Sequence, residues 1–240
     1  MDEEVLLSQE KEYDQIIQES KIDQLIRKGF IYKVYSLLLI QLGITFGFVV
    51  LANEIKSIAI FILSHYYIYI LMIIVPFIIL IYFAVKPEKA RQVPINYILL
   101  FIFCLSEAYT LVRFTIYFQR RSIYFSMLLT LIAVLALTIY AYKTEKDFSM
   151  IGGTLFVILV TLIIGEIINI LFFRLKILYV IFNLISLGLF SLYLIHDTQL
   201  IIGNKTMKLS EDDYILAVIN LYLDIIILFI DILSLFGGRR

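Results

Sequence analysis

The sequence predicts an all-α, polytopic membrane protein that forms a bundle of seven transmembrane helices. Of its 240 residues, 62% are hydrophobic and 17% are charged, whereas a soluble domain is about half apolar and a quarter charged. The mean hydropathy is +0.96. The apolar residues gather in stretches of about 20, the length that an α-helix needs to cross a bilayer core of about 30 Å.

The chain begins with a polar, acidic tail over residues 1–30, and we expect the transmembrane domain to occupy 31–240. The tail has too little apolar surface to offset the entropy lost on ordering, so we expect it to be solvated and partly helical. A helix that docks a partner is the alternative. Since the tail contains no apolar core of a cleavable signal peptide, the first apolar stretch is expected to target the chain to the membrane. The acids of the tail are Asp2, Glu3, Glu4, Glu10, Glu12, Asp14, Glu19 and Asp23.

Seven apolar stretches follow the tail, and short polar loops separate them. Such loops make neighbouring helices antiparallel, and they leave no room for a soluble domain. The second stretch could begin as early as Ile58. We place the stretches near 34–52, 66–85, 95–113, 123–142, 150–172, 177–196 and 215–236.

The distribution of Lys and Arg predicts a cytosolic N-terminus, because cytosolic loops carry the excess of these residues. With seven full crossings, twelve Lys and Arg residues fall on the side of the tail and eight on the other side. If the last segment dips into the membrane and returns, Arg239 and Arg240 change sides and the split becomes fourteen to six. That segment carries two acids, Asp224 and Asp231. The sequence thus leaves open whether it is re-entrant or crosses completely.

The composition excludes several classes of function. Lys and Arg number 20, as do Asp and Glu, so there is no basic excess to favour nucleic acid. The single cysteine, Cys104, excludes a disulfide framework and is expected to serve packing. His65 and His196 have no metal-ligand neighbours at useful spacing, so we expect structural or interfacial roles and neither a metal nor a cofactor. The Gly152-Gly153 pair is expected to allow close helix packing.

Five acids fall within the apolar stretches. A carboxylate at the bilayer centre costs at least about 2.5–3.5 kcal/mol, which makes each acid a candidate for function. Each could instead lie near a helix end and reach the headgroups. The five acids are Glu107, Glu166, Asp197, Asp224 and Asp231.

Two of the last segments carry polar stripes at helical spacing. Because a short loop joins these segments, we expect the stripes to face each other inside the bundle. Asp197 and Asp224 would then approach within hydrogen-bonding reach and share one proton, since burial and a neighbouring carboxylate both disfavour the ionised form. The stripes are Ser186, Tyr193 and Asp197 on the sixth segment and Asn220, Asp224 and Asp231 on the seventh.

Several motifs resemble the transmembrane Bax inhibitor motif family, especially its Lifeguard and Golgi anti-apoptotic branches. The resemblance covers roughly residues 30–236, and the Asp-Thr-Gln and Leu-Tyr-Leu-Asp elements together are fairly specific. The matching elements are Ile195–Gln199, Leu209–Tyr214 and Asn220–Ile226, with support from Phe30–Tyr35, Leu105–Tyr109 and Lys146–Phe148.

The resemblance implies a seven-helix bundle in the endoplasmic reticulum, the Golgi or a related membrane, with roles in restraining cell death and in calcium leak from internal stores. Asp197 and Asp224 match the paired aspartates of a pH-responsive gate. Glu211, Asp212 and Asp213 match an acidic cluster implicated in ion handling. Together with the acids inside the apolar stretches, these residues are candidates for an ion pathway.

The sequence departs from the family pattern at three points. Glu211 stands where relatives commonly have proline, and His196 stands where they often have tyrosine or an aliphatic residue. Some bacterial relatives pair the aspartates with an arginine on the second helix, but here no Lys or Arg occurs between Lys56 and Lys86. The pair is therefore expected to lack an arginine counter-charge.

The leading hypothesis is a pH-sensitive calcium or cation leak channel, with calcium as the permeant ion, that modulates cell death and is not an enzyme. The alternative is a non-conducting scaffold that binds apoptosis regulators or a store calcium-release channel. An intramembrane aspartyl protease fits poorly, because no glycine lies near Asp197 or Asp224. A seven-helix receptor or retinal protein also fits poorly, since the last segment has no lysine and the N-terminus is predicted to be cytosolic.

Overall fold

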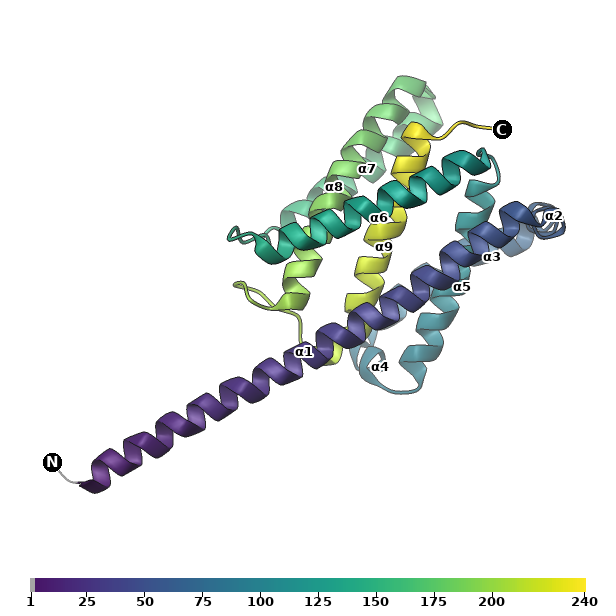
Figure 1. Cartoon of the computed structure of the whole chain (residues 1–240). Helices are drawn as coiled ribbons and strands as arrows, with labels where there is room; N and C mark the ends of the chain where they lie inside the picture. The colour runs from purple at the N-terminus through teal and green to yellow at the C-terminus, as the bar shows by residue number, and fades with distance from the viewer. Residues whose placement is uncertain (1–2) are drawn as a thin grey trace.

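The computed structural model describes residues 3–240, with the side chains of residues 18 and 21–240, as an entirely helical chain (Figure 1). Asp2 lies outside the described residues, and so do the side chains of the other tail acids except Asp23, which is exposed. The elements are α1 (Glu3–Glu54), α2 (Lys56–Ser64), α3 (Tyr66–Val85), α4 (Pro87–Arg91), α5 (Ile95–Thr115), α6 (Arg120–Lys143), α7 (Gly152–Ile168), the π-helix η1 (Asn169–Phe173), α8 (Lys176–Ile202), the 3-10 helix η2 (Glu211–Asp213) and α9 (Tyr214–Phe236).

Within residues 3–240, seven helices are long and apolar enough to cross a membrane, which confirms the predicted fold class. The second crossing begins at Tyr66 and not at Ile58, because the chain breaks at His65 between α2 and α3. The crossings are Lys21–Glu54, Tyr66–Val85, Ile95–Thr115, Arg120–Lys143, Gly152–Phe173, Lys176–Ile202 and Glu211–Phe236.

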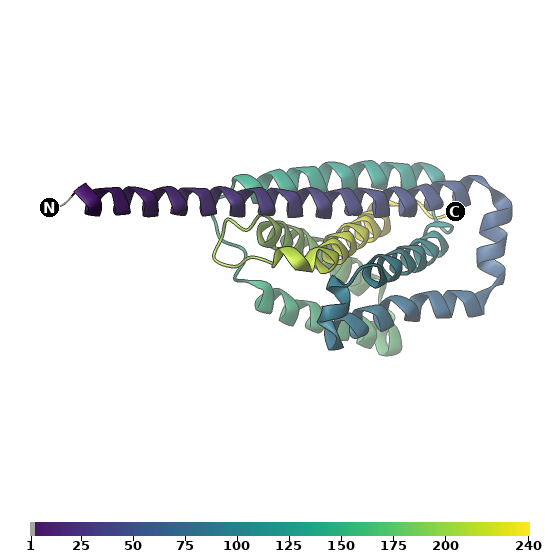
Figure 2. The same cartoon turned by 90° about the horizontal axis from the view of Figure 1, so that it is seen from below.

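The last helix, α9, forms the centre of the bundle (Figure 2). In its apolar window 72% of the residues are buried, against 17–50% in the other six crossings. It contacts α8, α1 and α6, whereas α3 packs mainly on α5 and α7 mainly on α8. A helix that is apolar on all sides is expected at such a position. The acids of α9 therefore lie in the core of the protein.

The last segment crosses the bundle completely, so the re-entrant alternative is wrong. After α9 the chain pairs with the turn between α5 and α6. The Gln119 amide donates to the Gly238 carbonyl at 2.8 Å, and the Arg240 amide donates to the Tyr117 carbonyl at 2.9 Å. That turn lies at the end of the bundle opposite the turn between α6 and α7 (Figure 1). Arg239 and Arg240 consequently lie at the end away from the loop between α8 and α9.

The predicted tail continues into the first crossing as one uninterrupted helix, α1. Among the side chains of α1 that the structure describes, Ile22 and Leu25 are exposed and Phe30 is the first that is buried. Residue 30 thus lies inside a continuous helix.

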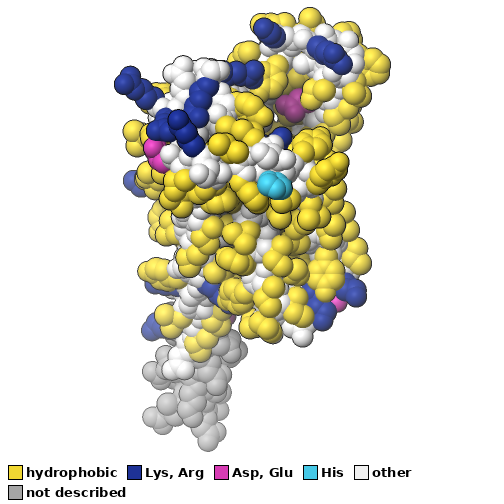
Figure 3. All heavy atoms as spheres, turned by 90° about the vertical axis from the view of Figure 1, so that its right-hand side faces the viewer, with side chains coloured by type: hydrophobic (Ala, Val, Ile, Leu, Met, Phe, Trp, Pro, Cys, Tyr) yellow, Lys and Arg dark blue, Asp and Glu magenta, His cyan; other side chains and the backbone are white. Residues whose placement is uncertain are grey.

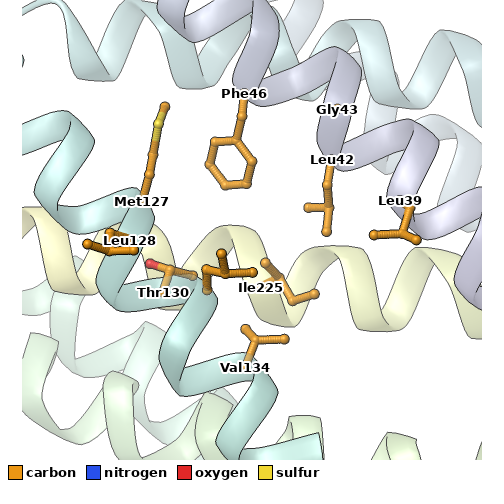
Figure 4. Close-up of a pocket in the computed structure, with 10 residues that line it drawn as sticks. Leu39, Leu42, Gly43, Phe46, Met127, Leu128, Thr130, Val134 and Ile225 are labelled. Carbon is orange, nitrogen blue, oxygen red and sulfur yellow. The ribbon is translucent and has the colours of Figure 1, made fainter.

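An apolar groove of about 450 Å³ separates α1 from α6 on one side of the bundle. Leu42 and Phe46 of α1 line one wall, Met127 of α6 lines the other, and Ile225 of α9 lies at the floor (Figure 4). The central helix is thus less tightly enclosed here than along its contact with α8.

Candidate functional site

The candidate site is the contact between α8 and α9, where two carboxylates lie in the core. Asp197 on α8 is 5% exposed and Asp224 on α9 is 4% exposed. The two groups are close enough for their charges to interact, and Tyr193 lies near both. Farther along the same contact, Ser186 lies near Asp231. The structure thus brings the two polar stripes together, except for Asn220, whose side chain is exposed.

His196 belongs to this site, although the sequence analysis gave it only a structural or interfacial role. Its Nδ1 lies 2.7 Å from Oδ1 of Asp197, and the imidazole is 8% exposed. Asp197 therefore pairs with its neighbour and not with Asp224, so the expected hydrogen bond between the two carboxylates is absent from the described residues. Oδ2 of Asp224 has no hydrogen-bond partner there either. A histidine directly before Asp197 was the only sequence signal for this pairing.

A glycine at the start of α7 fixes the position of the imidazole. A Cβ atom added to Gly152 would lie 2.8 Å from Nε2 of His196, closer than a side chain can approach. Because only glycine leaves this space, the N-terminus of α7 can press against the ring while Asp197 holds its other nitrogen. The predicted close packing at Gly152 is confirmed, and it serves the site.

The residues after Asp197 fasten neighbouring loops to α8. Gln199 accepts a hydrogen bond from the Phe148 amide at 2.7 Å and donates to the Lys146 carbonyl at 3.0 Å. In the same loop, Asp147 accepts hydrogen bonds from Ser149 and from the Thr206 amide. These hydrogen bonds lower the pKa of Asp147 below its usual range. The ionised carboxylate therefore ties the loop between α6 and α7 to the loop that precedes α9.

Arg27 of α1 joins the start of the bundle to the end of α8. Its guanidinium donates to the carbonyls of Leu200 and Ile202, and it donates to the Leu209 carbonyl at 2.6 Å. It also pairs with Glu211 at 2.8 Å. The arginine thus satisfies carbonyls that the C-terminus of a helix leaves free, and it holds the loop that leads to α9.

The predicted acidic cluster divides between two arginines. Glu211 binds Arg27. Asp213 forms a bidentate ion pair with Arg91, with distances of 2.8 and 2.9 Å. Asp212 is exposed, and among the described residues it forms no ion pair. Both arginines lie far away in the sequence, so no local pattern could have identified them.

Comparisons with known proteins identify the family of the chain. A family model described as "Inhibitor of apoptosis-promoting Bax1" matches residues 27–240. The chain belongs to the Bax inhibitor-1 family. It is 28% identical over 224 residues to human Protein lifeguard 3, covering 91% of this chain and 71% of that protein. It is 32% identical over 216 residues to Protein LIFEGUARD 2 of Arabidopsis thaliana, covering 88% of this chain and 87% of that protein. The family match begins at Arg27, the residue where α1 first joins the bundle.

This membership confirms the resemblance found in the motifs, and it makes the chain a multi-pass membrane protein of an anti-apoptotic family. Its lipid environment follows from the seven apolar helices.

In this member of the Bax inhibitor-1 family, the remaining predicted acids lie apart from Asp197 and Asp224. Glu107 on α5 is half-buried near Cys104 and Tyr222. Glu166 on α7 is half-buried and lies near Asp231, whose Oδ2 has no hydrogen-bond partner among the described residues. Within the same residues, no group of three or more His, Cys, Asp or Glu side chains could hold a metal ion.

Proposed function

We propose that this protein restrains cell death as a pH-sensitive leak for calcium or other cations in the endoplasmic reticulum or Golgi membrane, with its N-terminus in the cytosol. The observation that carries the proposal is the cluster of His196, Asp197 and Asp224, buried where α8 meets the central helix. Family membership supports the anti-apoptotic role.

The charge of this cluster depends on how many protons its three groups hold. Two ionised carboxylates and one imidazolium leave a net negative charge in the core. An unbalanced buried charge costs several kcal/mol, and either a proton or entering water removes that cost. Packing of α8 against α9 is thereby coupled to pH, and separation of these helices would open a polar path past Asp224.

The basic partner of Asp197 is a histidine and not an arginine. An arginine counter-charge would stay ionised at every physiological pH, whereas imidazole is the side chain whose charge ordinarily changes between pH 5 and 8.

The second candidate is a non-conducting scaffold that binds apoptosis regulators or a store calcium-release channel. The first part of α1 favours it, because this part of the helix extends well beyond the bundle and is available to a partner (Figure 1). Here the anti-apoptotic effect would come from binding and would need no ion flux.

Calcium flux through the purified protein in liposomes tests the proposal. The wild type should conduct with a pH-dependent rate. Asp197→Asn and Asp224→Asn keep the side-chain shape and each remove one titration, so both variants should lose most of that dependence. Asp23→Asn, at an exposed position of α1, is the matched control and should keep the wild-type profile. A wild-type profile in both cluster variants contradicts the sensor, and a wild type without flux leaves the scaffold as the function.

A further inference from the structure

A basic pocket lies at the end of the bundle away from the loop between α8 and α9. Its volume is about 490 Å³, and it is formed where the chain turns from α7 into α8 and where it leaves α9. Figure 3 shows Lys and Arg side chains gathered at the corresponding end of the molecule. The lining includes Asn169, Arg174, Leu175, Lys176, Tyr179 and Arg239.

The three cations of this pocket have no protein counter-charge. No Asp or Glu lines it, and none of the ion pairs within the described residues involves Arg174, Lys176 or Arg239. Like charges gathered around one cavity repel one another, and a bound anion removes this repulsion. Lys176 is also the first residue of α8, so the N-terminal end of that helix dipole adds to the positive potential.

The turn before α8 holds these groups in place. The side chain of Asn169 accepts a hydrogen bond from the Leu175 amide at 3.1 Å and donates to the Leu175 carbonyl at 3.3 Å. Arg174, the residue before Leu175, adopts a left-handed conformation with φ of 51°. This conformation is uncommon for a residue with a side chain. The two hydrogen bonds of the Asn169 side chain thus hold the turn in this conformation. The cationic residues Arg174 and Lys176 flank Leu175 there.

The surroundings of the pocket select a lipid as the ligand. Phe172 and Ile177, on either side of the turn, are 76% and 64% exposed, as expected for side chains that face acyl chains. Tyr179 lines the pocket, and its hydroxyl lies 3.4 Å from Oγ of Ser234. Tyrosine is typical of the level of the headgroups. We infer that this pocket binds the phosphate of an anionic phospholipid, with the acyl chains along the exposed apolar side chains beside it.

Native mass spectrometry of the full chain with added phosphatidylglycerol tests this inference. The double variant Lys176→Gln/Arg239→Gln should bind this lipid roughly tenfold more weakly, because each cation near a membrane surface contributes appreciably to the attraction of anionic lipid. The double variant Lys56→Gln/Arg121→Gln removes the same charge at the same end of the bundle, outside the pocket, and should bind within twofold of the wild type. Phosphatidylcholine should bind more weakly than phosphatidylglycerol to the wild type.

Three results would overturn the inference. Equal loss in both double variants would show a general charge effect. Equal binding of phosphatidylcholine would show that the anionic charge is not recognised. Displacement of the lipid by inorganic phosphate at equal concentration would make free phosphate the ligand. Reaction of the single, buried cysteine, Cys104, with a thiol dye reports whether each variant is folded. If the pocket double variant does not fold, Arg239→Gln alone, on the segment after α9, is tested against Arg121→Gln.

Discussion

At the scale of single residues, the main feature of the site is the contact of Asp197 with the histidine before it. Asp197 and His196 are both buried, and the 2.7 Å contact between them is the only contact of an acidic with a basic side chain within the core among the described residues. The other three ion pairs each include a partner that is substantially exposed. The His196–Asp197 contact therefore lies where solvent cannot screen it, unlike the three surface pairs.

Two neighbouring glycines test how tightly this pair is held. Gly152→Ala would place a Cβ atom 2.8 Å from His196, so the helix or the ring must shift, at a cost of about 1–3 kcal/mol. Gly153→Ala is the control, because its added Cβ meets nothing within 4 Å. The temperature at which Cys104 becomes reactive to a thiol dye should fall for Gly152→Ala and stay equal or rise for Gly153→Ala. Equal midpoints in the two variants would show that Gly152 does not position the ring.

Sequence reasoning could identify the acids of the site but not their partners. Asp197 and Asp224 could be identified because a carboxylate is unusual within an apolar stretch. Helical spacing then predicted that the two acids lie on facing polar stripes. His65 and His196 could not be distinguished in the sequence, because neither has a metal-ligand neighbour at useful spacing. In the structure His65 is exposed, whereas His196 packs against Gly152 and Asp197. Arg27 binds Glu211 from 184 residues away, a contact that only the tertiary structure reveals.

At the scale of helices, Arg27 connects α1 to the end of α8 and to the segment that leads into α9. The carbonyls that it binds belong to Leu200, Ile202 and Leu209, which follow Asp197 closely along the chain. Gly203, where α8 ends, has φ of 73° and lies so close to Arg27 that a Cβ atom would be 2.6 Å from its Nε. Arg27 thus links α1 directly to the helix that carries the site.

The start of the bundle can be located by comparing two changes in α1. Arg27→Gln should lower the midpoint of the thiol-dye assay, because it removes the donor to the partly buried carbonyls of Ile202 and Leu209, at a cost of about 1–3 kcal/mol. Deletion of residues 1–25 should leave the midpoint and membrane insertion nearly unchanged, since the described side chains before Arg27 are exposed. Lys28→Gln, at an exposed position, is the control for the lost charge. A large loss of monodisperse protein after the deletion would show that the tail packs on the bundle.

Most helix boundaries could be predicted to within a few residues, because polar loops interrupt the apolar stretches at clear positions. The exceptions are the start of α1 at Glu3, far before residue 34, and the end of α8 at Ile202. The complete crossing of the last segment could not be predicted from the sequence. Its two acids suggested contact with water, whereas the structure buries both Asp224 and Asp231 at 4% exposure. The bundle accommodates them because α9 is enclosed by α1, α6 and α8, and this enclosure depends on contacts between helices that no single stretch of sequence reveals.

At the scale of the whole molecule, the bundle has a fixed centre and one open side. The central α9 contacts α8 closely, whereas the apolar groove separates α1 from α6 on another side (Figure 4). Ile225 at the floor of that groove directly follows Asp224. The groove therefore places an apolar space beside the residue that follows Asp224, on a side of α9 other than its contact with α8.

The arrangement of the ends supplies a test of the orientation. Seven complete crossings put the chain on opposite sides of the membrane before α1 and after α9 (Figure 1), and the mild excess of Lys and Arg predicts that the side of α1 is cytosolic. A glycosylation acceptor fused before Met1 should stay unmodified in cells, whereas one fused after Arg240 should be modified in the lumen. An acceptor placed after Lys146, on the side of α1, should also stay unmodified. Modification at the N-terminal fusion but not at the C-terminal one would reverse the orientation, and the basic pocket would then face the cytosolic leaflet.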